Sequence, residues 1–229
     1  MIIIRKTVYS GQYMGKEIKK KRKSKKENNK KKKYCHKHDR YKIIHKDCGH
    51  GARSKVSIVK RKSDGKLLIW KQPLFDDRWH HESLRKEIKR SKLWRRLGVS
   101  RVKVCWHPDK RSLLKTYIKG DTLEQVLKKN PGFFSKKSRC LKALREFLGL
   151  LINSRRYIYD LIGENLIFDK KRWNIIDSGS VRNRDTRSGT KQEYKQELLK
   201  SWSKGFSSEE EIRSLESFID SVKPVKHRK

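Results

Sequence analysis

Apolar and polar residues change their spacing several times along this chain, and each spacing predicts a different kind of element. The two types alternate through residues 56–59, and a second β-prone run occupies residues 67–71. The segment between them contains Asp64 and Gly65, which are typical turn residues. The two runs are therefore predicted to pair as a β-hairpin.

Helical spacing follows this hairpin. Residues 80–97 place apolar side chains three or four positions apart and stop before Gly98, which is typical of an amphipathic helix. Strands are predicted at 101–106 and 112–118, on either side of a turn. The remaining predicted elements are a hairpin at 165–177 and helices at 121–129, 138–155, 190–203 and 208–222. Together these elements predict an α+β fold.

The charge of the chain is extreme, with 63 Lys and Arg against 25 Asp and Glu and a formal net charge of +38. A charge of this size indicates acidic partners such as nucleic acid, anionic lipid or phosphorylated glycan. Residues 16–33 concentrate it, with twelve Lys or Arg and two Glu. Such a block repels itself, so residues 1–40 are expected to form a basic, disordered tail that contacts an anionic surface or nucleic acid. A solvated extension without a partner is the alternative.

No apolar run approaches the roughly 18 residues that a membrane-spanning helix needs. The apolar start of the chain, residues 1–4, is too short for the core of a secretory signal. No transmembrane segment is therefore predicted. We expect a cytoplasmic protein that is at most peripheral to an anionic membrane surface, with direction into a host as the alternative.

Three polar residues in the second half of the chain are of the types that phosphoryl transfer uses. Asn165 follows Asp160 by five positions, and Asp177 follows Asn165 by twelve. One carboxylate can orient an acceptor hydroxyl, while an amide and a second carboxylate supply the oxygen ligands that Mg²⁺ prefers. The spacing resembles the catalytic loop and metal-binding turn of the protein-kinase superfamily. The resemblance implies that Asp160 is catalytic and that Asn165 and Asp177 hold the Mg²⁺ that accompanies ATP.

Residues upstream of this trio occur in the order that the resemblance requires. Gly49 and Gly51, followed by Val56, have the spacing of a kinase glycine-rich loop, whose backbone N–H groups approach phosphates. Ser54 stands where the third glycine usually is, and two glycines before a strand also fit a plain turn. Lys71 ends a run similar to the kinase strand whose lysine binds the α- and β-phosphates.

A carboxylate and a hinge extend the resemblance. Glu87, on the predicted helix 80–97, is expected to pair with Lys71, and Glu82 is the alternative. Tyr117 lies where the kinase hinge contacts adenine through main-chain groups. A solvated helix carboxylate and an ordinary buried strand are the simpler interpretations of these two features.

The sequence also departs from the kinase pattern. Ile158 and Tyr159 replace the histidine and arginine that usually precede the catalytic aspartate, so activation through a phosphorylated loop loses its receptor. Ile162 replaces a lysine typical of protein Ser/Thr kinases, and Ser178 replaces the phenylalanine of the metal-binding turn. Fifty residues follow Gly179, which is too few for a full helical C-terminal lobe.

The resemblance implies a kinase-like, two-lobe α+β fold. The N-terminal lobe, an antiparallel sheet with one helix, is expected at 41–119, and a reduced helical C-terminal lobe with the catalytic loop at 120–229. We expect an ATP- and Mg²⁺-dependent kinase that transfers the γ-phosphate to a hydroxyl, first of all on Ser or Thr of a protein. A lipopolysaccharide-core sugar kinase acting on a phosphorylated glycan is the second hypothesis. A non-catalytic kinase-fold scaffold that binds nucleic acid is the third.

Overall fold

The architecture comes from a computed structural model, in which residues 40–51, 54–177, 181–203, 206 and 208–225 are described. All of them belong to one compact unit of the chain. The predicted tail, apart from its last residue Arg40, lies outside the described residues. The basic block at 16–33 and its predicted partners therefore stay predictions.

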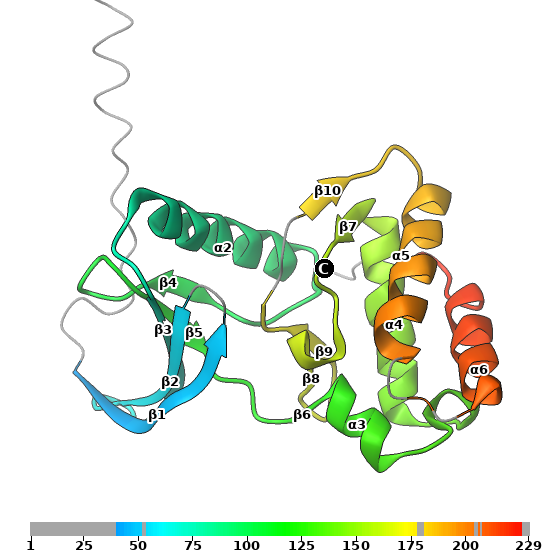
Figure 1. Cartoon of the computed structure of the whole chain (residues 1–229), viewed down its shortest axis with the longest axis horizontal. Helices are drawn as coiled ribbons and strands as arrows, with labels where there is room; N and C mark the ends of the chain where they lie inside the picture. Colours follow the sequence, from blue (N-terminus) through cyan, green and yellow to red (C-terminus); the bar gives the residue numbers. More distant parts are fainter. Residues whose placement is uncertain (1–39, 52–53, 178–180, 204–205, 207, 226–229) are drawn as a thin grey trace, which may run out of the picture. The chain divides into compact units, whose positions relative to one another are not determined.

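The first half of the described chain forms a five-stranded antiparallel sheet (Figure 1). Its strands lie in the order β1-β2-β3-β5-β4, and every neighbouring pair is antiparallel. Their bounds are β1 Tyr41–Gly51, β2 Ser54–Arg61, β3 Leu67–Pro73, β4 Val104–Trp106 and β5 Leu113–Thr116. The α+β class with an antiparallel sheet is confirmed.

The predicted hairpin is confirmed as β2 and β3, whose register sets Val56 opposite Lys71. Its turn uses Gly65 at a φ of 69°, a left-handed conformation that glycine adopts without a Cβ clash. Asp64 accepts a 2.7 Å hydrogen bond from the guanidinium of Arg61 across the same turn. Strand β1 was not predicted, because its sequence is largely polar and its pairing with β2 shifts register twice.

Helix α2, Arg78–Arg96, is the predicted helix at 80–97. It begins where the Asp77 side chain accepts a hydrogen bond from the His80 backbone N–H, and it ends before Gly98 at a φ of 73°. One face is buried, and the residues of that face are His80, Leu84, Glu87, Ser91 and Trp94. Leu84 packs with apolar side chains of β4 and β5, which fixes α2 against one face of the sheet (Figure 1).

The second half of the described chain is mainly helical and contains the largest apolar cluster. Helix α4, Arg139–Asn153, contributes most to it and contacts α5, which in turn contacts α6 (Figure 1). The other α-helices are α3 Leu123–Lys129, α5 Arg187–Trp202 and α6 Glu209–Asp220, and two short 3₁₀ helices are η1 Phe133–Ser135 and η2 Gly163–Asn165. The four predicted helices of this half are therefore confirmed, with ends that differ by at most three residues.

Short strands complete this half. The predicted hairpin at 165–177 is confirmed as β8 Leu166–Phe168 and β9 Trp173–Ile175. Three further strands were not predicted, because two or three residues are too few to show a period. These are β6 Asp121–Thr122, which pairs with β8, and β7 Arg156–Ile158, which pairs with β10 Val181–Asn183.

Direct contacts join the chain after α2 to the β8–β9 hairpin. The Ser100 hydroxyl donates to the Ile175 carbonyl at 3.0 Å, and the Arg101 backbone N–H donates to the Asn174 side chain at 2.9 Å. These bonds hold the end of β9, and therefore Asp177, near α2. Within the described part of the chain, no helix is long and apolar enough to cross a membrane.

Candidate active site

Lys71 is the centre of a charged cluster built from three separate elements. Its Nζ lies 3.0 Å from Glu87 Oε2 on α2 and 2.8 Å from Asp177 Oδ2, just after β9. The side chains of Lys71 and Glu87 are only 14% and 11% exposed, whereas that of Asp177 is 44% exposed. The structure thus brings together three of the residues that the sequence selected, across a separation of 106 positions between Lys71 and Asp177.

The pKa of Lys71 is shifted by opposing effects. Burial disfavours the charged ammonium, but the carboxylates of Glu87 and Asp177 outweigh it and raise the pKa of Lys71 above its ordinary value. Lys71 is therefore a fixed cation at neutral pH. A fixed cation beside a half-exposed carboxylate is suited to binding a phosphate and its counter-cation.

Glu87 reaches this cluster because of its place on α2. It lies on the buried face of the helix, three positions after Leu84, which packs against the sheet. Glu82, the alternative partner for Lys71, lies on the exposed side and pairs with Lys86 at 3.1 Å. The helical period therefore separates the two glutamates between the site and the solvent.

Lys115 is a member of the cluster that the sequence did not indicate. Its Nζ lies 2.6 Å from Glu87 Oε1, and its side chain is 7% exposed. Strand β5 sets Lys115 opposite Ile69 on β3, two positions before Lys71, so both lysines face α2. Lys115 directly follows the two leucines of β5, which was the available signal, but the abundance of lysine in the chain concealed it.

Two side chains of helix α5 form hydrogen bonds to the backbone of the segment that carries Asp160. The Tyr194 hydroxyl accepts a hydrogen bond from the Ile158 N–H at 3.2 Å and donates one to the Arg156 carbonyl at 2.9 Å. The indole N–H of Trp202 donates to the Leu161 carbonyl at 2.9 Å in a buried position. Sequence reasoning missed both aromatic residues. Their spacing of eight positions on one helix fits a core face equally well.

Asn165 connects this loop to the turn that carries Asp177. Its side-chain nitrogen donates to the Asp160 carbonyl at 3.0 Å, and its own carbonyl accepts from the Ile176 N–H at 3.0 Å. The first bond leaves the side-chain oxygen of Asn165 for a ligand, and the second places Asn165 beside the residue that precedes Asp177. The amide oxygen and the carboxylate therefore come from the same end of the β8–β9 hairpin.

Asp160 lies on the exposed side of its loop. Among the described residues, its carboxylate has no hydrogen bond or ion pair, and its link to the cluster runs through Asn165. Asp160 is exposed on a loop that the buried residues Ile158 and Leu161 anchor, so its carboxylate is accessible to an acceptor group. The structure thus places Asp160 beside, but not within, the Lys71 cluster.

The predicted nucleotide-binding residues lie in two places. Gly49 pairs with Val56 and Gly51 with Ser54 at the closed end of the β1–β2 hairpin, whose tip at 52–53 lies outside the described residues. Val56 is opposite Lys71, so the two side chains share one face of the sheet. Tyr117 follows β5 and lines a groove of about 650 Å³ together with other residues, including Leu68 and Leu114. Successive side chains of a strand point to opposite faces, so Leu114 lies on the face of the sheet opposite to that of Lys115 and Lys71. Leu68 lies on the same face as Leu114.

The donor set can be tested against a magnesium ion. Among the residues that the structure describes, no group of three or more His, Cys, Asp or Glu side chains could hold a metal by itself. Asn165 and Asp177 offer one amide oxygen and one carboxylate. Mg²⁺ is often held by one or two carboxylates and completes its shell with waters and substrate phosphates, so this pair fits that ion only when a nucleotide accompanies it.

A cavity of about 480 Å³ lies next to the Asp160 loop. The loop contributes Gly163 and Glu164, and α3 approaches so closely that a Cβ on Gly163 would lie 3.1 Å from the Glu124 nitrogen. Trp202 and Phe206 supply aromatic walls. Three glutamates line the cavity against a single lysine, and these are Glu124, Glu164, Glu211 and Lys128. Since Lys128 pairs with Glu124 at 2.7 Å, the lining is acidic in a strongly basic protein.

Comparisons with known proteins add nothing to this picture, because no protein-family model and no curated protein matches the chain. The kinase resemblance therefore depends on the residues and geometry described above.

Proposed function

We propose that this protein is an ATP- and Mg²⁺-dependent phosphotransferase with a two-lobe, kinase-like fold, and that its acceptor is a hydroxyl of a polypeptide. The observation that carries the proposal is the pairing of Lys71 with both Glu87 and Asp177. A lysine, a helix glutamate and a turn aspartate from three distant segments meet in the order that the kinase resemblance requires. A purely structural ion pair needs no third member that is nearly half exposed.

Each residue has a role in this proposal. Lys71 binds the phosphates of the nucleotide and Glu87 holds its ammonium in place. Asn165 and Asp177 supply oxygen ligands, and the Mg²⁺ that they hold would neutralise phosphate charge during transfer. Asp160 orients the acceptor hydroxyl and accepts its proton. The bonds from Tyr194 and Trp202 keep the Asp160 loop in position.

The acidic cavity supports a polypeptide acceptor over a phosphorylated glycan. Glu124, Glu164 and Glu211 would repel a phosphate group, whereas they attract a segment that contains Lys or Arg. The aromatic walls from Trp202 and Phe206 offer apolar contact to side chains of such a segment. A Ser or Thr flanked by basic residues is therefore the acceptor that fits best.

The test is transfer from radiolabelled ATP, with Mg²⁺, to two peptides of equal length. One peptide carries a central Ser with Lys neighbours and the other a central Ser with Glu neighbours, and a lipopolysaccharide fraction is assayed in parallel. We expect label in the Lys-flanked peptide. Asp160→Asn and Asp177→Asn should each lower turnover at least about 100-fold, because each removes a group used in the transfer step.

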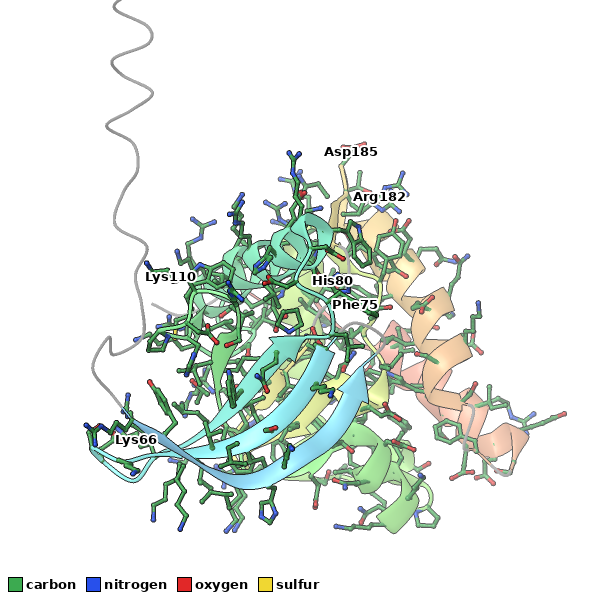
Figure 2. All side chains as sticks on the ribbon, turned by 60° about the vertical axis from the view of Figure 1, so that its left-hand side comes forward. Lys66, Phe75, His80, Lys110, Arg182 and Asp185 are labelled. Atoms are coloured by element: carbon green, nitrogen blue, oxygen red, sulfur yellow. The ribbon has the colours of Figure 1, made fainter. Side chains whose placement is uncertain are left out.

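Asp185→Asn is the matched control, because Asp185 is exposed and lies outside the cluster (Figure 2). It should keep full turnover, and all three variants should melt like the parent protein. Label in the lipopolysaccharide fraction alone would replace our acceptor with a sugar. Absence of any ATP turnover, together with salt-sensitive binding of nucleic acid, would replace the enzyme with a scaffold.

A further inference from the structure

Helix α2 carries a row of cations on the side opposite its buried face. The row consists of Arg78, Arg85, Lys89, Lys92 and Arg96, and all five side chains are exposed. Their spacings of seven, four, three and four positions keep them on one helix face. With a rise of 1.5 Å per residue, the row extends over about 27 Å. We call these five residues the α2 cation row.

Carboxylates compensate the α2 cation row only in part, because Glu82 interacts electrostatically with Arg78 and Arg85 but forms its ion pair with Lys86. Among the described residues, none of the five forms an ion pair, since Glu82 is paired with Lys86 and Glu87 is buried in the Lys71 cluster. Like charges three or four positions apart destabilise a helix, and Arg78 stands in the positive first turn, which holds no acidic residue. A bound polyanion would remove this repulsion.

Exposed aromatic rings lie at the N-terminal end of the same helix. Phe75 is 62% exposed and Trp79 is 55% exposed. Both rings contact the His80 ring, with centroid distances of 5.4 Å for Phe75 and 5.1 Å for Trp79 (Figure 2 labels Phe75 and His80). Large exposed rings next to a row of cations are the two components of single-stranded nucleic-acid sites.

The loop that presents Phe75 is anchored. Asp76 pairs with His81 at 2.6 Å and with Arg111 at 3.1 Å, and Asp77 both caps α2 and pairs with His80. These contacts tie the loop to α2 and to Arg111. Phe75 is therefore an exposed ring on a loop whose two following aspartates each have a hydrogen-bond or ion-pair partner.

We propose that α2 and the preceding loop bind single-stranded nucleic acid, with phosphates on the α2 cation row and bases stacked on Phe75 and Trp79. A duplex hides its base faces, so it cannot use the rings. A membrane surface fits less well, because an interfacial helix inserts an apolar face and the apolar face of α2 is buried against β4 and β5. The proposed site uses none of residues 16–33 and does not depend on phosphotransferase activity.

The experiment measures binding of a fluorescent oligothymidylate to the full-length protein by anisotropy, over a series of salt concentrations. Lys89→Gln/Lys92→Gln should weaken binding and reduce the slope of log K against log salt by about 1.4, since each phosphate contact to a single strand contributes about 0.7. Lys142→Gln/Lys200→Gln removes the same charge from exposed positions on α4 and α5 and should change the slope far less. Lys89→Arg/Lys92→Arg should restore the parent slope.

The second variant tests stacking. Phe75→Ala should weaken oligothymidylate binding at least about fivefold without changing the salt slope, because stacking on an aromatic ring involves no phosphate. Binding of a duplex of equal length and of anionic phosphatidylserine vesicles should not change. If the α4/α5 control loses as much as the α2 variant, or if Phe75→Ala affects duplex and single strand equally, the proposed site is wrong. A loss confined to vesicles would assign the surface to membranes instead.

Discussion

Replacing Glu87 with Met should destabilise the protein mainly through Lys115 and not through Lys71. In the parent, Glu87 separates two cations, with Lys71 at 3.0 Å and Lys115 at 2.6 Å. After Glu87→Met, Lys71 still has Asp177 at 2.8 Å. Lys115 is 7% exposed and would be left buried without its carboxylate partner.

The magnitude follows from this unpaired charge. Removing one partner of a buried ion pair typically costs about 3 to 5 kcal/mol, whereas replacing both partners with apolar residues is often close to neutral. We therefore expect Glu87→Met to lower the free energy of unfolding by about 4 kcal/mol. Lys115→Met should lower the free energy of unfolding by only about 1 kcal/mol, because Glu87 keeps Lys71 as a partner and no charge is left unpaired. The double variant should lie within about 2 kcal/mol of the parent, since Met at both positions can join the nearby cluster of Leu84, Val104 and Leu113.

Urea unfolding followed by tryptophan fluorescence measures these differences, since the chain has six Trp residues. With a slope of about 2 kcal/mol per molar urea, a loss of about 4 kcal/mol moves the midpoint by about 2 M. The diagnostic quantity is the coupling energy of the double-mutant cycle, which should be at least about 3 kcal/mol in favour of the double variant. Additive losses would show that Lys115 and Glu87 are not partners and would refute the reasoning.

Three further predictions concern the parts that support the site. Gly120→Ala should lower the free energy of unfolding by about 3 kcal/mol in urea unfolding, because the new Cβ would lie 2.0 Å from the Phe168 carbonyl oxygen. The control Gly132→Ala has open space around it and should cost only about 1 kcal/mol, which is the cost of its positive φ. Equal losses would contradict the close approach of Gly120 to Phe168. Tyr194→Phe should cost about 1 to 3 kcal/mol, because it leaves a buried backbone N–H without its partner, and a neutral result would mean that α5 does not hold the Asp160 loop. Burial raises the pKa of Cys140 and that of Tyr157 to about 12 each. As the pH rises, the unfolded chain loses these two protons before the folded chain does, so the free energy of unfolding should fall between about pH 9 and pH 12. Unfolding curves at pH 8, 9 and 10 should show this decline, and constant stability would contradict it.

Local signals were sufficient for most elements of the fold. The hairpin at 56–71 follows from alternation on either side of a Gly turn, and α2 follows from its apolar period and its Gly98 stop. The four helices of the second half and the β8–β9 hairpin follow from the same kind of evidence. In each case the residues that specify the element lie within the element or next to it. Short strands such as β7 were not predicted, because their partner strands are distant in the sequence and their own three residues are too few to show a period.

The site was only partly visible in this way. Lys71, Glu87, Asn165 and Asp177 could be selected from the sequence, because their order and spacing along the chain resemble those of the kinase superfamily. Lys115, the second cation that contacts Glu87, could not be selected in this way. Whether Lys115 faces α2 or solvent depends on the register between β3 and β5, and a shift of one residue would reverse it.

Tertiary packing decided the remaining features for one physical reason. A periodic pattern tells which face of a helix or strand is apolar, but it does not tell which other element covers that face. The support of the Asp160 loop by Tyr194 joins residues 36 positions apart, and the pair of Lys71 with Asp177 joins residues 106 positions apart. Such contacts form only when separate elements pack together, so their partners are determined by the folded chain as a whole.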